Sequence, residues 1–340
     1  MPADPDVYGY TLVSVAPSPV RPGYGGFNIK LYGRDSVHPM SGSTRSDTRT
    51  VRTPVRAGLL GALLVLGGCS STVLLYNNAP WLLKLQLGDY VTLTAPQDDM
   101  LDATLQELAL WHRESELPHY QDTANRLAES IQDGLTRQEI SDAMYQFEDI
   151  RRRMAERLIP PISEFLHTLD ADQVKEYRAA VLENIEEDRE EMAIAPAQRL
   201  AERFEKTVER LEDWVGTLSG EQLTSLRPAF AGIPDRRDYY LNRREQRLEQ
   251  FTQFMQDSPS PDRIDAYLRE LYLREPSAEE RAKLSVRAEW IDFFLVLDQS
   301  LTPEQRKHAL GELSGYANDF AELHLSLHAE QLADSGERDR

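Results

Sequence analysis

The sequence predicts an all-α fold, an irregular multi-helix bundle of about seven to nine helices. The first observation is that residues 69–340 hold only 8 of the chain's 18 glycines, and helices disfavour glycine whereas tight turns and phosphate loops need it. The second is that apolar residues recur at the spacing of a helix face, and the third is that helix-start signals punctuate the same region. No stretch beyond residue 97 alternates as a strand would, so we expect no sheet there.

Residues 1–68 differ from the rest of the 340-residue chain in composition and charge. They hold 10 of the 18 glycines and 7 of the 19 prolines, and their net charge is +3, whereas residues 69–340 carry −22. Because proteins neutralise nucleic-acid phosphates with a basic surface, the acidic helical part predicts no nucleic-acid partner. The single cysteine excludes a disulfide within the chain and a CxxC zinc site.

The junction between the two parts has the form of a secretory signal. Three arginines precede an apolar run at residues 57–66, and small residues follow it up to Cys69. A basic region, a short apolar region and small residues before a cleavage point define such a signal. The run is too short to span a bilayer, which takes roughly 20 apolar residues.

The end of this run, Leu66-Gly67-Gly68-Cys69, resembles the bacterial lipobox. The resemblance implies that diacylglycerol is attached to the Cys69 sulfur, that the chain is cleaved before Cys69, and that a fatty acid such as palmitate acylates the new amino group. Ser70, rather than an aspartate, follows the cysteine, which by the usual sorting rule implies the periplasmic face of the outer membrane. The alternative is a buried cysteine in an ordinary apolar helix.

The signal lies far from the first residue, although signal peptides begin near a start codon. We therefore expect translation to start at Met40, or at Val51 read as an alternative start codon. The rival interpretation is a genuine disordered extension. The predicted organisation is a spurious or disordered extension (1–39), a lipoprotein signal peptide (40–68), a lipid-anchored segment (69–96), a helical domain (97–332) and a disordered tail (333–340).

Capping boxes mark the helix starts of the predicted domain. In a capping box the N-cap side chain and a Glu or Gln three residues later each satisfy a backbone N–H of the first turn. The phrase Leu-(Asp/Ser/Thr)-x-(Asp/Glu)-Gln recurs at residues 169, 218 and 301, which we interpret as repeated helix-start chemistry. The five predicted boxes are Thr136/Glu139, Asp170/Gln173, Ser219/Gln222, Ser277/Glu280 and Thr302/Gln305.

The most distinctive segment runs from Trp111 to Tyr120. On a regular helix His112, Glu116 and His119 stand at i, i+4 and i+7 and share a face, so they could ligate a metal in an open site. Pro118 perturbs this turn, however, and no further ligand is identifiable, so we expect an architectural His–Glu pair and no bound metal or cofactor. The candidate functional or structural block comprises Trp111, His112, Arg113, Glu116, Pro118 and Tyr120.

Two other clusters could each be either a binding site or a structural feature. His324 and His328 are four residues apart, a spacing that suits a metal, but without a third ligand we expect a half-buried structural pair. The basic–aromatic segment at residues 236–247 has five arginines around Tyr239 and Tyr240. It could bind a phosphate, a lipid headgroup or an acidic partner, but in so acidic a domain we expect it to pair with carboxylates of the chain itself.

Over residues 69–325 the chain resembles an uncharacterised family of proteobacterial lipoproteins built from a domain of unknown function. The resemblance rests on aromatic and acidic residues soon after the cysteine, on the Trp-His-Arg and Glu-Leu-Pro-x-Tyr block, and on a Leu-Thr-Pro-Glu-Gln-Arg phrase. It implies no catalytic residue. The matching positions are Tyr76, Trp81, Asp89 and Tyr90, then Trp111–Arg113, Glu116–Pro118 with Tyr120, and Leu301–Arg306.

These observations favour a non-enzymatic helical module, anchored to the outer membrane by its lipid, that acts in the periplasm as a binding, scaffold or chaperone-like protein with a protein partner. The chain has no GxSxG, SxxK or glycine-rich phosphate motif. The alternative is a metal-binding protein or hydrolase that uses the His112/Glu116 face. A third option is a small ligand held in the helical core.

Overall fold

The computed structural model describes residues 71–338, which form thirteen α-helices and no strand. The all-α prediction is therefore confirmed for this part of the chain. Helices α4 and α5 are joined by a π-helical turn, η2, into one continuous segment, so the described residues contain twelve separate helical segments rather than seven to nine. The bounds are α2 (Ser71–Asn77), α3 (Ala79–Gly88), α4 (Ala95–Trp111), η2 (His112–Glu116), α5 (Leu117–Asp133), α6 (Arg137–His167), α7 (Ala171–Met192), α8 (Pro196–Val215), α9 (Gly220–Ala231), α10 (Arg237–Met255), α11 (Pro261–Tyr272), α12 (Ala278–Leu284), α13 (Arg287–Ser300) and α14 (Pro303–Arg338).

The predicted helix count was too low because several helices are short. Helices α2 and α12 have 7 residues each and α3 has 10, which is too few turns for a 3.6-residue period to emerge from the sequence. Conversely, Pro160 and Pro161 do not end a helix but lie inside the 31-residue helix α6.

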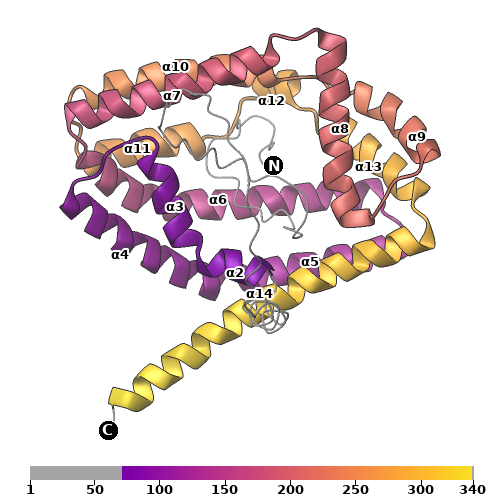
Figure 1. The fold of residues 1–340 in the computed structure, drawn as a ribbon, viewed down its shortest axis with the longest axis horizontal. Helices are drawn as coiled ribbons and strands as arrows, with labels where there is room; N and C mark the ends of the chain where they lie inside the picture. The colour runs from indigo at the N-terminus through magenta and orange to yellow at the C-terminus, as the bar shows by residue number, and fades with distance from the viewer. Residues whose placement is uncertain (1–70, 339–340) are drawn as a thin grey trace, which may run out of the picture.

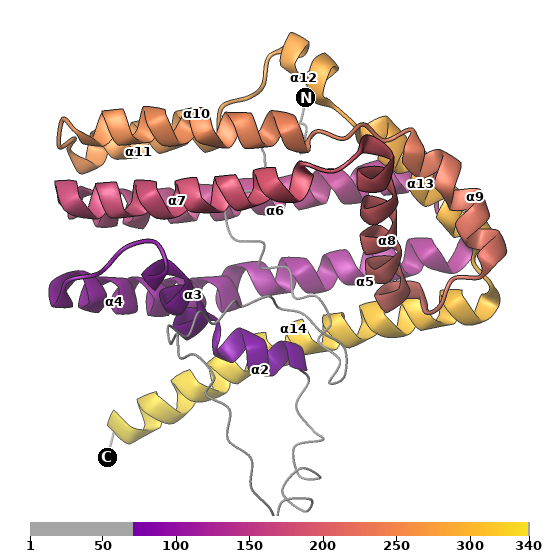
Figure 2. The same cartoon turned by 45° about the horizontal axis from the view of Figure 1, so that its top comes forward.

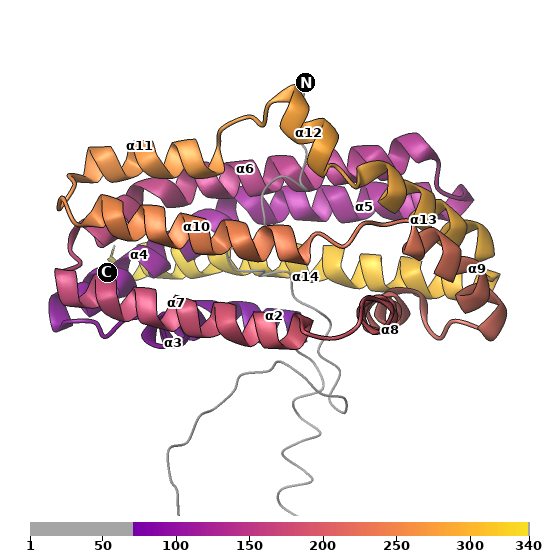
Figure 3. The ribbon, with the colours of Figure 1, turned by 90° about the horizontal axis from the view of Figure 1, so that it is seen from above.

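The long helices are stacked in layers. Figure 2 shows α10 and α11 above α6 and α7, which lie above α4 and α5, with α14 lowest. Helix α11 packs on α6, α10 on α7, and α14 along α5. Helix α8 crosses this stack at one end, where it is seen end-on in Figure 3, and α9 and α13 lie beside it.

The apolar interior is divided among four clusters rather than gathered in one core. The largest lies at the α8 end and joins α8, α9, α13 and the start of α14 around Phe230 and Phe293. Two further clusters hold α6, α7, α10 and α11 together. The fourth, formed by Val73, Leu117 and Leu323, joins α2, α5 and α14. This last cluster includes Leu117, which belongs to the Trp111–Tyr120 segment that the sequence singled out.

All five predicted capping boxes are present. Each N-cap residue and its Glu or Gln partner make both reciprocal bonds, as at Thr302, whose N–H donates to Gln305 while Gln305 N–H donates to the Thr302 hydroxyl. A sixth box, Thr94 with Gln97, starts α4 and was not predicted. The sequence-defined domain boundaries remain predictions, although α14 continues to Arg338.

Candidate functional site

The Trp111–Tyr120 block is built on the π-helical turn η2. Pro118 has no N–H with which to continue an α-helical ladder, and the preceding turn widens so that Leu117 N–H reaches the His112 carbonyl five residues back. The Arg113 carbonyl thereby loses its ordinary donor, the N–H of Leu117. Nδ1–H of His324, on α14, donates to it at 2.9 Å. The π-helical turn thus leaves the Arg113 carbonyl without a donor from its own helix, and His324 of α14 supplies the donor instead.

His112 lies between two tyrosines. Its Nδ1 is 2.7 Å from the Tyr76 hydroxyl of α2, and its Nε2 is 3.2 Å from the Tyr120 hydroxyl of α5. A neutral imidazole has one donor and one acceptor, so one hydroxyl donates to the ring and the other accepts from it. Burial lowers the pKa of His112 to about 4, against the opposing effect of the Glu116 carboxylate. Burial also raises the pKa of both tyrosines above the usual value of 10. The chain of three groups is therefore neutral at pH 7.

Glu116 is almost fully buried, with 2% of its surface exposed, and it forms an ion pair with Arg153 of α6. Arg153 Nε donates to both carboxylate oxygens, at 3.0 and 3.2 Å, and its Nη2 donates to Oε2 at 2.9 Å. This fork geometry is the strong form of an arginine–carboxylate contact. The bond to Glu116 raises the pKa of Arg153. The pair fixes the π turn against α6.

The remaining block residues also make contacts between helices. Arg113 donates to the side chain of Asn77 and its guanidinium lies 5.7 Å from the centre of the Tyr76 ring. The guanidinium of Arg157 lies 5.8 Å from the centre of a Trp111 ring. Tyr120 meets Phe320 of α14 edge to face. The block therefore joins α2, α6 and α14 around the junction of α4 and α5.

The residues weighed as candidate metal ligands, His112, Glu116 and His119, do not form a ligand set in this structure. His119 is exposed, whereas Glu116 is buried against Arg153. Among the described residues no group of three His, Cys, Asp or Glu side chains is placed to hold a metal. Cys69, residues 1–68 and the side chain of His328 lie outside what the structure describes.

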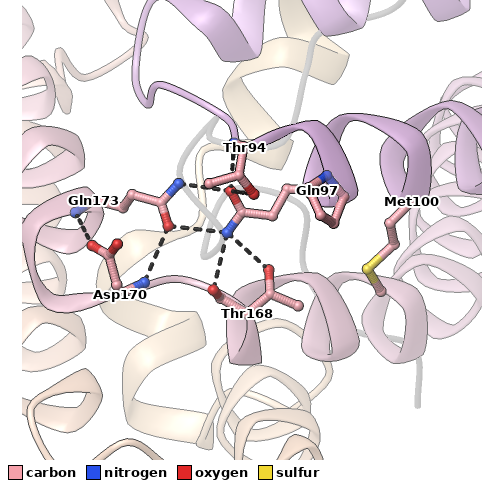
Figure 4. A pocket seen from close by; sticks show the side chains of 7 residues that line it. Thr94, Gln97, Met100, Thr168, Asp170 and Gln173 are labelled. Atoms are coloured by element: carbon pink, nitrogen blue, oxygen red, sulfur yellow. Dashed lines mark hydrogen bonds between the residues drawn. The ribbon is translucent and has the colours of Figure 1, made fainter.

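A pocket of about 400 Å³ lies where α4 and α7 begin, and sequence reasoning did not find it. Figure 4 shows that two glutamines, one from each of the two capping boxes, are among the side chains that line it. Gln97 Nε2 donates to the Thr168 carbonyl at 2.9 Å, and Gln173 Nε2 donates to the Thr92 carbonyl at 2.8 Å. The two amides also bond to each other. Their donors are therefore used within the chain rather than pointed at a ligand.

A second glutamine pair repeats this arrangement where α9 and α14 begin, at the opposite end of the molecule (Figure 1). Gln222 Nε2 donates to the Ser300 carbonyl at 2.8 Å, and Gln305 Nε2 donates to the Thr217 carbonyl at 2.7 Å. The two glutamines of a pair make equivalent bonds, which gives each pair two-fold symmetry. Each side-chain amide donates to the backbone carbonyl of the residue that lies two positions before the N-cap of the other glutamine's helix. The shared signal is (Ser/Thr)-Leu-(Ser/Thr/Asp)-x-x-Gln, at residues 92–97, 168–173, 217–222 and 300–305.

Replacing one of these glutamines should lower the free energy of unfolding by more than the loss of a surface contact does. We expect Gln97→Ala to lower the free energy of unfolding by about 2–3 kcal/mol, because it removes half of a capping box and leaves the buried Gln173 amide with fewer partners. Urea unfolding followed by circular dichroism measures this. The matched control is Gln138→Ala, an exposed helix residue bonded only to a side chain. A Gln97→Ala loss no larger than that of the control would contradict the proposed role of the pair.

The predicted basic cluster is paired within the chain in part, as expected. Arg237 bonds to Asp235 at 2.8 Å, and Arg244 bonds to Asp188 of α7 at 2.9 Å. Arg243 and Arg247 have no such carboxylate partner among the described residues. The Arg244–Asp188 contact ties α10 to α7, so at least this member of the cluster serves the fold.

Together these features define an all-helical protein whose most distinctive polar residues bond to one another across helix junctions. A model of a family of unknown function, DUF6279, matches residues 89–278, which is more than half of the chain, and the chain belongs to this family. The predicted membership of an uncharacterised family is thus confirmed. Comparisons with curated proteins and with solved structures gave no match.

Proposed function

We propose that this chain is a lipoprotein of the outer membrane, anchored through Cys69 on the periplasmic face, and that its helical domain acts there as a binding or scaffold module. The observation that carries the proposal is the lipobox-like sequence ending at Cys69, the only cysteine, placed two residues before the first described helix, α2. None of the described helices is long and apolar enough to cross a bilayer. Attachment through acyl chains agrees with that finding.

The module part of the proposal is supported by how the block residues are used. His112, Glu116 and Arg113 each bond to a residue of another helix, which is the behaviour of groups that hold helices in place. The alternative of a metal protein or hydrolase gains no support from His112 or Glu116, whose polar atoms face tyrosines and an arginine.

The anchor is tested by the mass of the mature protein. Expressed with its own leader in a Gram-negative host, the chain should be extracted from the outer membrane with its first residue at Cys69 and with added diacylglycerol and fatty acyl mass. A Cys69→Ala variant should lose that mass and leave the membrane fraction. Residues 1–39 on the mature form, or an unmodified Cys69, would overturn the proposal.

The partner is tested by crosslinking in intact cells, followed by purification of the anchored protein. We expect one envelope protein to be recovered reproducibly, at a level well above that found with an unrelated lipoprotein as bait. Repeated failure to enrich any envelope protein would contradict the binding or scaffold role while leaving the anchor intact.

A further inference from the structure

The first two helices, α2 and α3, differ from the rest of the described chain in charge. Residues 71–88 contain a single charged side chain, Lys84, in a sequence of which 28% is charged. That one charge is paired, because Lys84 Nζ lies 2.9 Å from Asp98 and 2.8 Å from Asp102, both on α4. These ion pairs hold α3 on α4, and α3 carries no other charged side chain.

Each of these two helices exposes large apolar side chains. Leu74 of α2 is 64% exposed, and Trp81 and Leu85 of α3 are 62% and 45% exposed. Trp81 and Leu85 are four residues apart, so they lie on the same face of α3. Exposed large apolar residues are common singly, but a group of them on an uncharged segment marks an interaction surface. Both helices lie on the outside of the stack, with α2 against α14 and α3 against α4 (Figure 2).

We infer that this surface, Leu74, Trp81 and Leu85, rests on the lipid bilayer, an inference that builds on the proposed anchor at Cys69. Only Ser70 separates Cys69 from α2, and consecutive Cα atoms are about 3.8 Å apart, so acyl chains on Cys69 enter the bilayer within about 8 Å of the start of α2. A surface this close to an anchor meets lipid before any other partner. Tryptophan favours the bilayer interface, where its ring is buried and its N–H remains hydrated.

Contact with lipid gives the anchored domain a fixed orientation. An acyl anchor alone acts as a tether about which a domain rotates, whereas an anchor with an adjacent apolar face defines which side of the domain faces the membrane. In Figure 2, α10 and α11 form the layer on the opposite side of the stack from α2 and α3. With α2 and α3 on the bilayer, these two helices are then the surface offered to a periplasmic partner.

The test is tryptophan quenching by brominated lipid in the full mature protein. The protein is purified from membranes and reconstituted in vesicles of phosphatidylethanolamine and phosphatidylglycerol, with bromine on the acyl chains. We expect part of the tryptophan emission to be quenched, and Trp81→Phe to abolish most of that quenched part. Trp290→Phe is the matched control, because Trp290 packs against the apolar cluster around Phe230 and Phe293, and it should leave the quenched part unchanged.

A second variant tests the surface without relying on fluorescence. Leu85→Glu places a charge on the proposed lipid face, whereas Phe147→Glu places one at another exposed apolar residue, on α6. Burial of a leucine side chain is equivalent to about a tenfold or greater change in partition. We therefore expect Leu85→Glu to raise the protein released from vesicles by mild detergent at least tenfold, and Phe147→Glu to leave it unchanged.

The outcomes separate this inference from the anchor itself. Intact mass of the same sample reports whether Cys69 is acylated. Acylated protein with no quenching at Trp81 would overturn the lipid-facing surface and leave the anchor in place. A stable dimer in solution that Trp81→Glu dissociates would also overturn it, because the surface would then be covered by a second copy. Quenching by added vesicles without acylation would support the surface and contradict the anchor.

Discussion

Replacing Arg153 with methionine should lower the free energy of unfolding by about 3–5 kcal/mol, since it leaves the Glu116 carboxylate charged and unpaired in the interior. The reverse change, Glu116→Gln, should cost clearly less, because the Arg153 side chain is 36% exposed and can turn to solvent. The double variant Glu116→Leu/Arg153→Met should recover most of the loss, because no charge remains buried. Urea unfolding of the three variants measures these differences in the free energy of unfolding.

The neighbouring residue supplies the control for this experiment. Arg152 also forms ion pairs, with Glu156 and Glu275, but all three side chains are about half exposed. Exposed pairs contribute about 0–1 kcal/mol, so Arg152→Met should change stability by no more than that. If Arg152→Met and Arg153→Met cost the same, the burial of Glu116 does not have the energetic consequence that we assign to it.

Acid should destabilise this protein through His112. Burial holds the pKa of His112 at about 4 in the folded chain, whereas an unfolded chain has a histidine pKa of about 6.5. Between those values the unfolded chain binds a proton at this residue and the folded chain does not. The free energy of unfolding therefore falls as pH falls from about 6.5 to about 4, by about 3 kcal/mol in total.

The change is measured as the pH dependence of the urea midpoint for two histidine variants. His112→Gln removes the titrating group and should flatten the slope between pH 6.5 and 4. His119→Gln changes an exposed histidine seven residues away and should leave the slope as it is. Carboxylates contribute to the acid slope of every variant, so only the difference between the two variants reports on His112. Equal slopes would show that His112 is not held neutral by the fold.

The sequence predicted the fold class and the helix starts because these depend on local chemistry. A capping box is complete within four residues, so Thr136/Glu139 and Ser277/Glu280 could be identified without knowing the neighbours. The short helices were missed because their stability comes from packing, as for α2, which relies on α14 and α5. A period of 3.6 residues cannot be established in seven.

The candidate block could be singled out from the sequence as a distinctive segment, but its contacts could not be predicted. The partners of His112 and Glu116 are Tyr76 and Arg153, 36 and 37 residues away, and no spacing rule links such positions. The glutamine pairs were closer to being predictable. Three of the four glutamine-containing phrases were identified from the sequence as helix starts, but the fourth, which ends at Gln97, was not. The arrangement of the phrases in two pairs can be seen only when all four are known.

The glutamine pairs also bear on how the chain folds. Gln97 and Gln173 are 76 residues apart, and Gln222 and Gln305 are 83 apart, so the pairs close two long loops of similar length and hence of similar entropic cost. The loops are not independent, because α11 from the second loop packs on α6 from the first. Neither loop can open without exposing apolar surface of the other. Because the two loops pack on each other, we expect the helical stack to unfold as a single cooperative unit, although its apolar interior is divided into four clusters.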